Sequence, residues 1–141
     1  MSADLHEYLK RTTLFAGFSD RQIEGVLTVA KEQRFAGGEP IIRRGEEGGL
    51  GFYLVLEGRT EVRAGDEVLA QLGPGEYFGE MALLLDDTPR TADVVALEDT
   101  VCLAITQWAF RSLLAVHPDM AVAVMGELAR RLGDTSRSPV E

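Results

Sequence analysis

The sequence has few of the residues that build metal centres and disulfides. Its 141 residues include one cysteine, Cys102, and two histidines, His6 and His117, at opposite ends of the chain. A single cysteine excludes an internal disulfide and a multi-cysteine metal or iron–sulfur site. Two distant histidines do not supply the clustered ligands of a metal-dependent hydrolase. We therefore expect a protein that is not an enzyme, with Cys102 in an apolar interior.

Long apolar runs and an excess of positive charge are also missing. No run approaches the roughly 18 residues that cross a bilayer, and the N-terminus lacks a basic-then-apolar signal pattern. We therefore expect a cytoplasmic protein with no membrane partner. Lysine and arginine total 14 against 23 aspartates and glutamates, which gives a net charge of -9. Such a chain repels a polyphosphate backbone, so we expect no direct nucleic-acid partner.

Length and composition predict one globular domain over residues 1–141, since 45% of the residues are hydrophobic and 26% are charged. Residues 1–32 are predicted to form an N-terminal helical motif of two short helices that divide at Gly17. The second helix begins at Ser19, with Gln22 three residues on, which is the capping-box pattern. The linker 14–18 is too apolar for a solvated loop and is predicted to be packed.

Residues 33–105 have a sequence pattern typical of β structure, because glycines recur and apolar residues alternate with polar ones. Short strands divided by glycine turns, without a βαβ rhythm, predict a closed or double-sheet antiparallel roll. The candidate strands are residues 33–36, 40–43, 51–57, 60–63, 67–72, 77–78, 91–96 and 100–105.

Residues 106–133 return to a helical period. A helix that contains Trp108, Phe110, Leu113 and Leu114 is predicted to end before His117-Pro118, and a last helix is predicted from Pro118 to Leu132. Gly133 is the expected C-terminal cap, which leaves residues 134–141 as a polar tail.

The last helix also carries an apolar stripe. Met125, Leu128 and Leu132 are predicted to pack on the chain's own domain or on a twin helix. Because Gly126 interrupts this stripe, we expect a monomer or a weak homodimer.

Residues 75–92 interrupt the β pattern. Gly79 is followed by helix formers, and the start of a short helix presents unpaired backbone N–H groups to an anion. Arg90 follows within one loop, and its guanidinium matches two phosphate oxygens. A carboxylate at Glu80 would repel a bare phosphate, but it suits a ligand that also carries hydroxyl groups. The pattern therefore favours a nucleotide, which a β roll can hold between its sheets.

Each residue of this segment also has a purely structural interpretation. Glu80 would stabilise a helix start without any ligand, by about 0.3–1 kcal/mol. Arg90 would pair with Asp86 or Asp87 on the surface, and Thr91 would begin a strand. The same fold with an empty site is the corresponding alternative for the whole chain.

The segments FGEMAL at residues 78–83 and PRTA at residues 89–92 resemble the phosphate-binding cassette of cyclic nucleotide-binding domains. Such domains occur in bacterial catabolite activator proteins, protein kinase A regulatory subunits and cyclic-nucleotide-gated channels. The resemblance extends over residues 5–132. It implies a mainly β fold with flanking α-helices: an eight-stranded antiparallel β roll, an N-terminal helical motif, a short phosphate-binding helix and two C-terminal helices. The implied ligand is cAMP or cGMP, with no cofactor and no metal.

The resemblance also implies roles for individual residues. Glu80, with the Gly79 backbone, would accept a hydrogen bond from the ribose 2′-hydroxyl, and Arg90 would pair with the cyclic phosphate. Backbone N–H groups of Ala82 and Thr91 would cover the other phosphate oxygens, while the Thr91 hydroxyl would touch phosphate or a purine edge. The residues assigned to the ligand are Gly79, Glu80, Met81, Ala82, Arg90, Thr91, Ala92, Thr135 and Ser136.

The C-terminal segment resembles the long last helix of the catabolite activator proteins. Continuing that register places Thr135 and Ser136 where those proteins contact the purine. The 24 residues after His117 are too few for the winged helix-turn-helix that follows this domain in the transcription factors. We therefore expect a sensor whose partner is a protein effector or a fused effector domain.

Two alternatives stay open at this point. One is a receptor for cAMP or cGMP that moves its C-terminal helices, and the other is a nucleotide-free fold that acts as a protein interaction module. Thr91 favours cGMP as the ligand, while the C-terminal helix favours cAMP.

Overall fold

The computed structural model describes residues 2–43, 51–79 and 92–136. The chain divides into two compact units. We call residues 29–110 the β unit, and residues 1–28 with 111–141 the helical unit.

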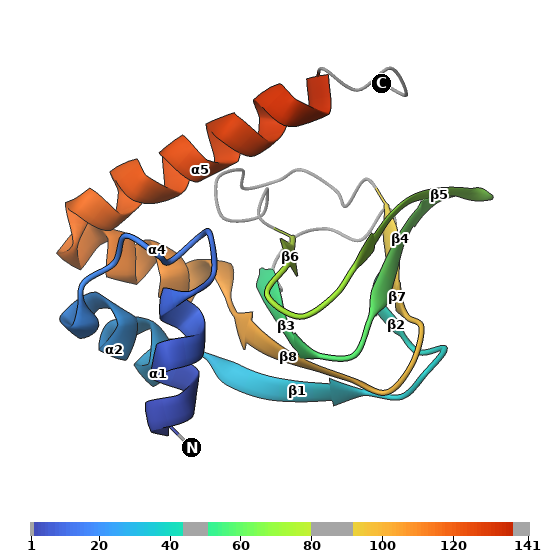
Figure 1. Cartoon of the computed structure of the whole chain (residues 1–141), viewed down its shortest axis with the longest axis horizontal. Coiled ribbons are helices and arrows are strands. Elements are labelled where there is room, and N and C mark those ends of the chain that lie inside the picture. The colour runs from blue at the N-terminus through green and yellow to red at the C-terminus, as the bar shows by residue number, and fades with distance from the viewer. Residues whose placement is uncertain (1, 44–50, 80–91, 137–141) are drawn as a thin grey trace. The chain divides into compact units, whose positions relative to one another are not determined.

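The β unit contains two four-stranded antiparallel sheets (Figure 1). The order in one sheet is β1-β8-β3-β6, and in the other it is β2-β7-β4-β5. This arrangement confirms the predicted mainly β fold with flanking helices and an antiparallel roll. The strands are β1 Lys31–Phe35, β2 Pro40–Ile42, β3 Phe52–Glu57, β4 Thr60–Ala64, β5 Glu67–Leu72, β6 Tyr77–Phe78, β7 Asp93–Ala96 and β8 Thr100–Ile105.

Five of the eight strands, β1, β2, β3, β4 and β7, have boundaries that differ by one or two residues from the sequence prediction. The first strand begins at Lys31, two residues before the predicted start, because β1 pairs with β8 over its whole length, from Lys31 opposite Ala104 to Phe35 opposite Thr100. Strand β2 ends at Ile42, one residue before the predicted end. The predicted strand at residues 91–96 is found as β7 from Asp93, and Thr91 lies outside the described residues.

The core of the β unit is apolar and draws on both sheets. Tyr53, Val55 and Phe78 from one sheet pack with Val94 and Ala96 from the other. Cys102 belongs to the same cluster and is fully buried, as its sequence context predicted. A continuous core of this kind holds the two sheets together through the hydrophobic effect.

The N-terminal part of the helical unit contains α1 (Ser2–Lys10) and α2 (Asp20–Val29). The predicted capping box is present: the Ser19 N–H donates to Gln22 Oε1 at 2.9 Å, and the Gln22 N–H donates to Ser19 Oγ at 3.2 Å. The apolar linker is packed, since Phe15 and Phe18 are buried with their rings edge to face at a centroid distance of 5.2 Å. Both features therefore follow the sequence prediction.

Helix α4 spans Gln107–Val116 and passes from the β unit into the helical unit. Phe110 is fully buried, whereas Trp108 is 78% exposed. Two positions apart on an α-helix point about 200° from each other, so Trp108 and Phe110 cannot share a face.

Helix α5 spans Pro118–Ser136, which corrects two predictions. Gly133 does not cap the helix, so the predicted polar tail does not begin at residue 134; residues 137–141 lie outside the described part of the chain. Each glycine inside a helix costs only about 1 kcal/mol, so neither Gly126 nor Gly133 ends α5.

The buried side chains of α5 also differ from the predicted stripe. Met120 and Val124, four residues apart, are buried, whereas Met125 is 52% exposed. None of the helices in the described ranges is both long enough and apolar enough to cross a membrane.

Candidate functional site

The structure places four of the nine residues predicted to bind a ligand. Gly79 directly follows β6, and Ala92 directly precedes β7. Thr135 and Ser136 are the last two residues of α5. The other five, together with the predicted short helix and the pairing candidates Asp86 and Asp87, lie outside the described residues. These five are Glu80, Met81, Ala82, Arg90 and Thr91.

The entry to the candidate segment is held firmly in one sheet. Strand β6 pairs with β3, with Phe78 opposite Tyr53. The two rings are stacked at a centroid distance of 5.1 Å, and each residue is buried. Gly79 then has a φ of 82°, a left-handed conformation that glycine adopts without steric cost. The segment therefore leaves β6 at a fixed point and in a direction that only glycine readily allows.

The turn before β6 is fixed by hydrogen bonds that the sequence reasoning missed. The Gly73 N–H donates to the Glu76 carboxylate at 2.7 Å. The Gly75 N–H donates to the Val55 carbonyl, and the Val55 N–H donates to the Glu76 carbonyl, each at 2.9 Å. The bond between Gly73 and Glu76 had a signal in the sequence, because Glu76 follows three residues after Gly73, the first glycine of the Gly-Pro-Gly turn.

The exit from the segment is held in the other sheet. After Ala92 the chain enters β7, which lies between β2 and β4. Val94 and Ala96 of this strand are buried in the core. The predicted cassette therefore begins at an edge strand of one sheet and ends at an inner strand of the other, so both of its ends are anchored in the β unit.

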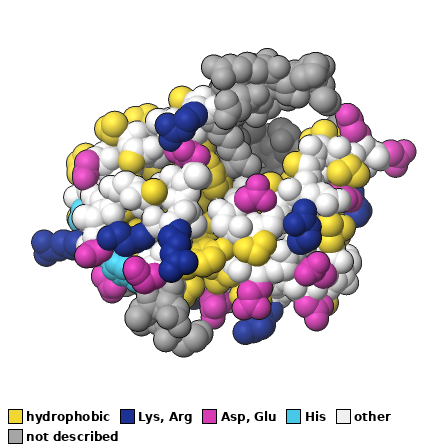
Figure 2. Space-filling view, viewed as in Figure 1, with side chains coloured by type: hydrophobic (Ala, Val, Ile, Leu, Met, Phe, Trp, Pro, Cys, Tyr) yellow, Lys and Arg dark blue, Asp and Glu magenta, His cyan; other side chains and the backbone are white. Residues whose placement is uncertain are grey.

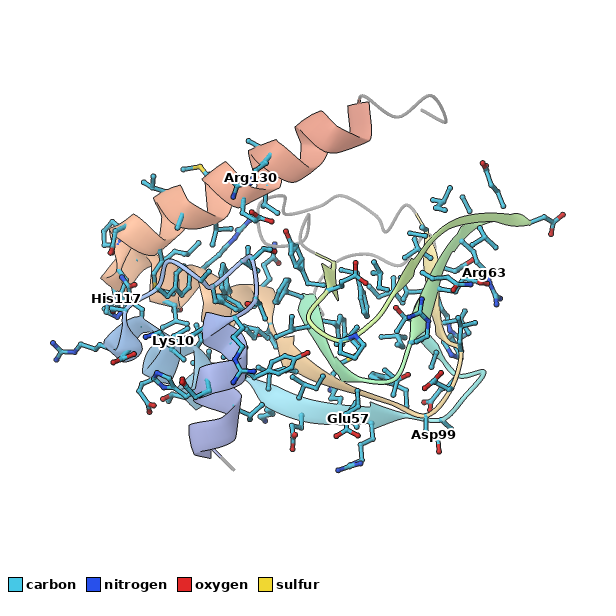
Figure 3. The ribbon with its side chains drawn as sticks, viewed as in Figure 1. Lys10, Glu57, Arg63, Asp99, His117 and Arg130 are labelled. Atoms are coloured by element: carbon cyan, nitrogen blue, oxygen red, sulfur yellow. The ribbon has the colours of Figure 1, made fainter. Side chains whose placement is uncertain are left out.

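Strand β4 presents different chemistry on its two faces. Val62 packs against the apolar core. Its neighbours Glu61 and Arg63 form an ion pair, with Arg63 Nε 2.6 Å from Glu61 Oε1. Figure 3 labels Arg63. Gln71 Nε2 donates to the second Glu61 oxygen at 3.1 Å. The hydrogen bond from Arg63, followed by the one from Gln71, lowers the pKa of the Glu61 carboxyl. Arg63 is thus engaged with a carboxylate, away from the apolar interior.

Two groups that often take part in catalysis, a metal cluster and a reactive thiol, can be checked among the described residues. Among them there is no cluster of three or more histidine, cysteine or acidic side chains that could hold a metal ion. Burial raises the pKa of the Cys102 thiol to about 12. Since the thiolate is the nucleophilic form, a thiol with this pKa is inert at neutral pH.

The visible surface carries charges of both signs. Figure 2 shows acidic and basic side chains interspersed over this face, among apolar and uncharged groups. Among the described residues on this face, the basic side chains form no continuous stripe.

Comparison with known proteins decides the family. Residues 32–117, more than half of the chain, match the family model described as "Cyclic nucleotide-binding domain". The chain belongs to this family. The match contains all of the described β strands except the first residue of β1, and it also contains the whole candidate segment.

Individual members of the cyclic nucleotide-binding domain family are similar over most of the chain. The cyclic AMP receptor protein of Thermus thermophilus is 36% identical over 129 residues, which are 88% of this chain and 59% of that protein. The cGMP-dependent protein kinase of Toxoplasma gondii is 31% identical over 73% of this chain, but over only 10% of the kinase. The chain thus spans little more than half of the first relative and a small part of the second.

A solved structure matches over nearly the whole of both chains. The N-terminal domain of a transcriptional regulator from Streptomyces coelicolor A3(2) has a TM-score of 0.77 and 32% identity, covering 93% of this chain and 96% of that domain. This similarity supports the mainly β fold with flanking helices found here.

Proposed function

We propose that this protein is a receptor for a cyclic nucleotide, cAMP or cGMP, and that it acts by regulation and not by catalysis. The observation that carries the proposal is the pattern FGEMAL followed by PRTA at residues 78–92, between β6 and β7 and inside the region matched to the family. The positions of Gly79, directly after β6, and Ala92, directly before β7, support the proposal, because they attach the two ends of the candidate segment to both sheets of the β unit.

The proposed contacts divide the ligand between the two ends of the segment. Arg90 pairs with the cyclic phosphate, and the backbone N–H groups of Ala82 and Thr91 bind its other oxygens. Glu80 accepts a hydrogen bond from the ribose 2′-hydroxyl, with help from the Gly79 backbone. One guanidinium and one carboxylate in this arrangement would favour a nucleotide over a bare phosphate.

The proposed ligand is cAMP in preference to cGMP. Helix α5 continues through Gly133 to Ser136, so Thr135 and Ser136 stand on a helix. This continuity supports a contact between one of these hydroxyls and the purine. The similarity to a protein named as a cyclic AMP receptor, at 36% identity, favours the same base, although the similarity to a cGMP-dependent kinase keeps cGMP as the alternative.

Isothermal titration calorimetry with cAMP and with cGMP tests the proposal. We expect saturable binding of at least one nucleotide at one site per chain, with tighter binding of cAMP. Absence of heat with either nucleotide, from protein whose melting curve shows that it is folded, would instead support the interaction-module alternative.

The same titration with 2′-deoxy-cAMP tests the role of Glu80. Loss of the ligand hydroxyl should weaken binding to the wild-type protein, because the carboxylate then lacks its donor. In the Glu80→Ala variant, cAMP and 2′-deoxy-cAMP should bind equally, since one partner is already gone. An undiminished preference for cAMP in this variant would contradict the assignment.

The proposed output is a movement of the C-terminal helices, transmitted by packed side chains. Tyr77 of β6, just before the cassette, packs against Phe52 at a centroid distance of 5.6 Å. Phe52 in turn stacks on Phe110 of α4 at 6.3 Å. Ligand capture would draw Met81, Leu83 and Leu84 inward against Phe110 and Leu113, and would shift α4 and the α5 helix that follows it.

Backbone chemical shifts and amide hydrogen exchange of α5 test this transmission. We expect both to change between the free protein and the protein saturated with cAMP, because a ligand shifts a conformational equilibrium by its differential affinity for the two states. Unchanged values in Pro118–Ser136, with calorimetry showing full occupancy, would rule out the movement but leave the receptor function intact. The effector is proposed to be a fused domain or a separate protein.

A further inference from the structure

Helices α1 and α2 contact each other through four charged or titratable side chains, two from each helix. His6 and Lys10 are four residues apart on α1, and Asp20 and Glu24 are four residues apart on α2, so each pair lies on one side of its helix. His6 Nδ1 lies 3.0 Å from Glu24 Oε2, and His6 Nε2 lies 3.1 Å from Asp20 Oδ1. Lys10 Nζ donates to the same Asp20 oxygen at 2.6 Å. The histidine therefore bridges two carboxylates of the neighbouring helix.

This geometry requires the protonated form of the histidine. A neutral imidazole carries one N–H, so it can donate to only one of the two carboxylates, and its other nitrogen would face an acceptor. The imidazolium donates from both nitrogens. The His6 side chain is 18% exposed, whereas its partners Asp20 and Glu24 are 74% and 65% exposed. The ring is thus largely shielded from water, whereas the two carboxylates that it bridges are open to solvent.

We propose that His6 is a proton-dependent clamp that fastens α1 to α2 when the ring is doubly protonated and loosens this attachment when the ring loses one proton. The clamp lies before residue 32, where the family match begins, and it does not depend on the proposed nucleotide site. Lys10 contributes an ion pair that persists across the titration of histidine, so deprotonation weakens the attachment without removing it.

The charges around His6 set the direction of the effect. Hydrogen bonds to Asp20 and then to Glu24 raise the pKa of His6 above 6.5. The hydrogen bond from Lys10, followed by that from His6, lowers the pKa of Asp20, so this carboxylate stays ionised. When folding raises the pKa of a group, the protonated group stabilises the folded form. This stabilisation is complete at pH values below the pKa of the group in the unfolded chain, and it is lost as the pH rises through the pKa of the group in the folded chain. The attachment of α1 is therefore strongest in weakly acidic conditions and weakens above them.

A second contact extends the reach of the clamp within the helical unit. Gln22 of α2 is buried, and its Nε2 donates to the Asp119 carboxylate in the first turn of α5 at 2.7 Å. Helix α2 therefore binds α1 through His6 and binds α5 through Gln22. Loss of a proton from His6 therefore weakens a contact of α2, and α2 is the helix that also binds the first turn of α5.

Nuclear magnetic resonance on the protein without nucleotide tests the clamp. The variant His117→Gln leaves His6 as the sole imidazole, and its ring shifts should titrate with a midpoint above 6.5. Amide protection factors of α1, corrected for intrinsic exchange, should fall severalfold between pH of about 6 and about 8, on either side of histidine titration. Those of β8 should stay constant over the same range.

Two further variants separate the clamp from general effects of charge. Glu24→Gln should lower both the midpoint of His6 and the protection of α1 at acidic pH, whereas Glu32→Gln on the exposed strand β1 removes the same charge and should change neither. His6→Gln should give α1 protection that is low and independent of pH. The proposal is overturned if His6 titrates at or below 6.5, or if α1 keeps its pH dependence in His6→Gln.

Discussion

Replacement of Arg90 by alanine should abolish measurable binding of cAMP. The guanidinium is proposed to donate two charge-assisted hydrogen bonds to the cyclic phosphate, each worth about 1.5–3 kcal/mol. Each step of about 1.4 kcal/mol is a factor of ten in affinity, so we expect a loss of at least about 100-fold. Calorimetry with cAMP measures this loss directly.

Two variants control for the loss of positive charge from an acidic protein. Arg34→Ala removes an exposed arginine from β1, and it should leave the affinity for cAMP within a factor of a few. Arg90→Lys keeps the charge but loses the planar fork, so its affinity should fall between those of the wild type and Arg90→Ala. If Arg34→Ala weakened binding as much as Arg90→Ala, the net charge and not a phosphate contact would explain the effect.

Replacement of Gly58 by alanine should destabilise the β unit strongly. Gly58 joins β3 to β4 with a φ of +94°, and a Cβ there would lie 2.5 Å from the Asp99 carbonyl oxygen and 2.5 Å from Thr100 Oγ1. The Thr100 hydroxyl donates to the Glu98 carbonyl at 2.8 Å, so it cannot move freely. The left-handed backbone costs about 1–2 kcal/mol, and the forced displacement adds about 1–3 kcal/mol. Urea unfolding followed by circular dichroism measures the sum.

Gly65→Ala is the matched control for this prediction. Gly65 joins β4 to β5 with a φ of +64°, but a Cβ at this position would meet nothing within 4 Å. The backbone cost is then present without the clash, so we expect a loss of about 1–2 kcal/mol. Equal losses in the two variants would show that the close approach of Gly58 to the turn between β7 and β8 contributes nothing.

Features that depend on neighbours along the chain were predictable from the sequence. The capping box at Ser19 and Gln22 needs only a three-residue spacing, and both of its hydrogen bonds are present. Strands β5, β6 and β8 have the predicted boundaries, and glycine or proline residues lie beside the first two of them in the sequence. The candidate site was predicted as a spacing of residue types in the same way: a glycine, a carboxylate and an arginine within one segment.

Features that depend on distant partners were decided by the tertiary structure. Strand β1 begins at Lys31 because β8, about 70 residues later, offers it a pairing partner there. Gln22 bonds to Asp119 across 97 residues, and His6 meets Asp20 and Glu24 on another helix. The sequence also did not predict that the two ends of the candidate segment, at β6 and β7, belong to different sheets.

The sequence alone therefore determined the classes of element, their turns and the chemistry available between β6 and β7. The tertiary structure decided which side chains are buried, as the contrast between exposed Trp108 and buried Phe110 shows. It also decided which charged groups on separate helices come within hydrogen-bonding distance. The physical reason is that backbone conformation and capping are short-range interactions, whereas burial and the pairing of distant charges require the chain to have folded.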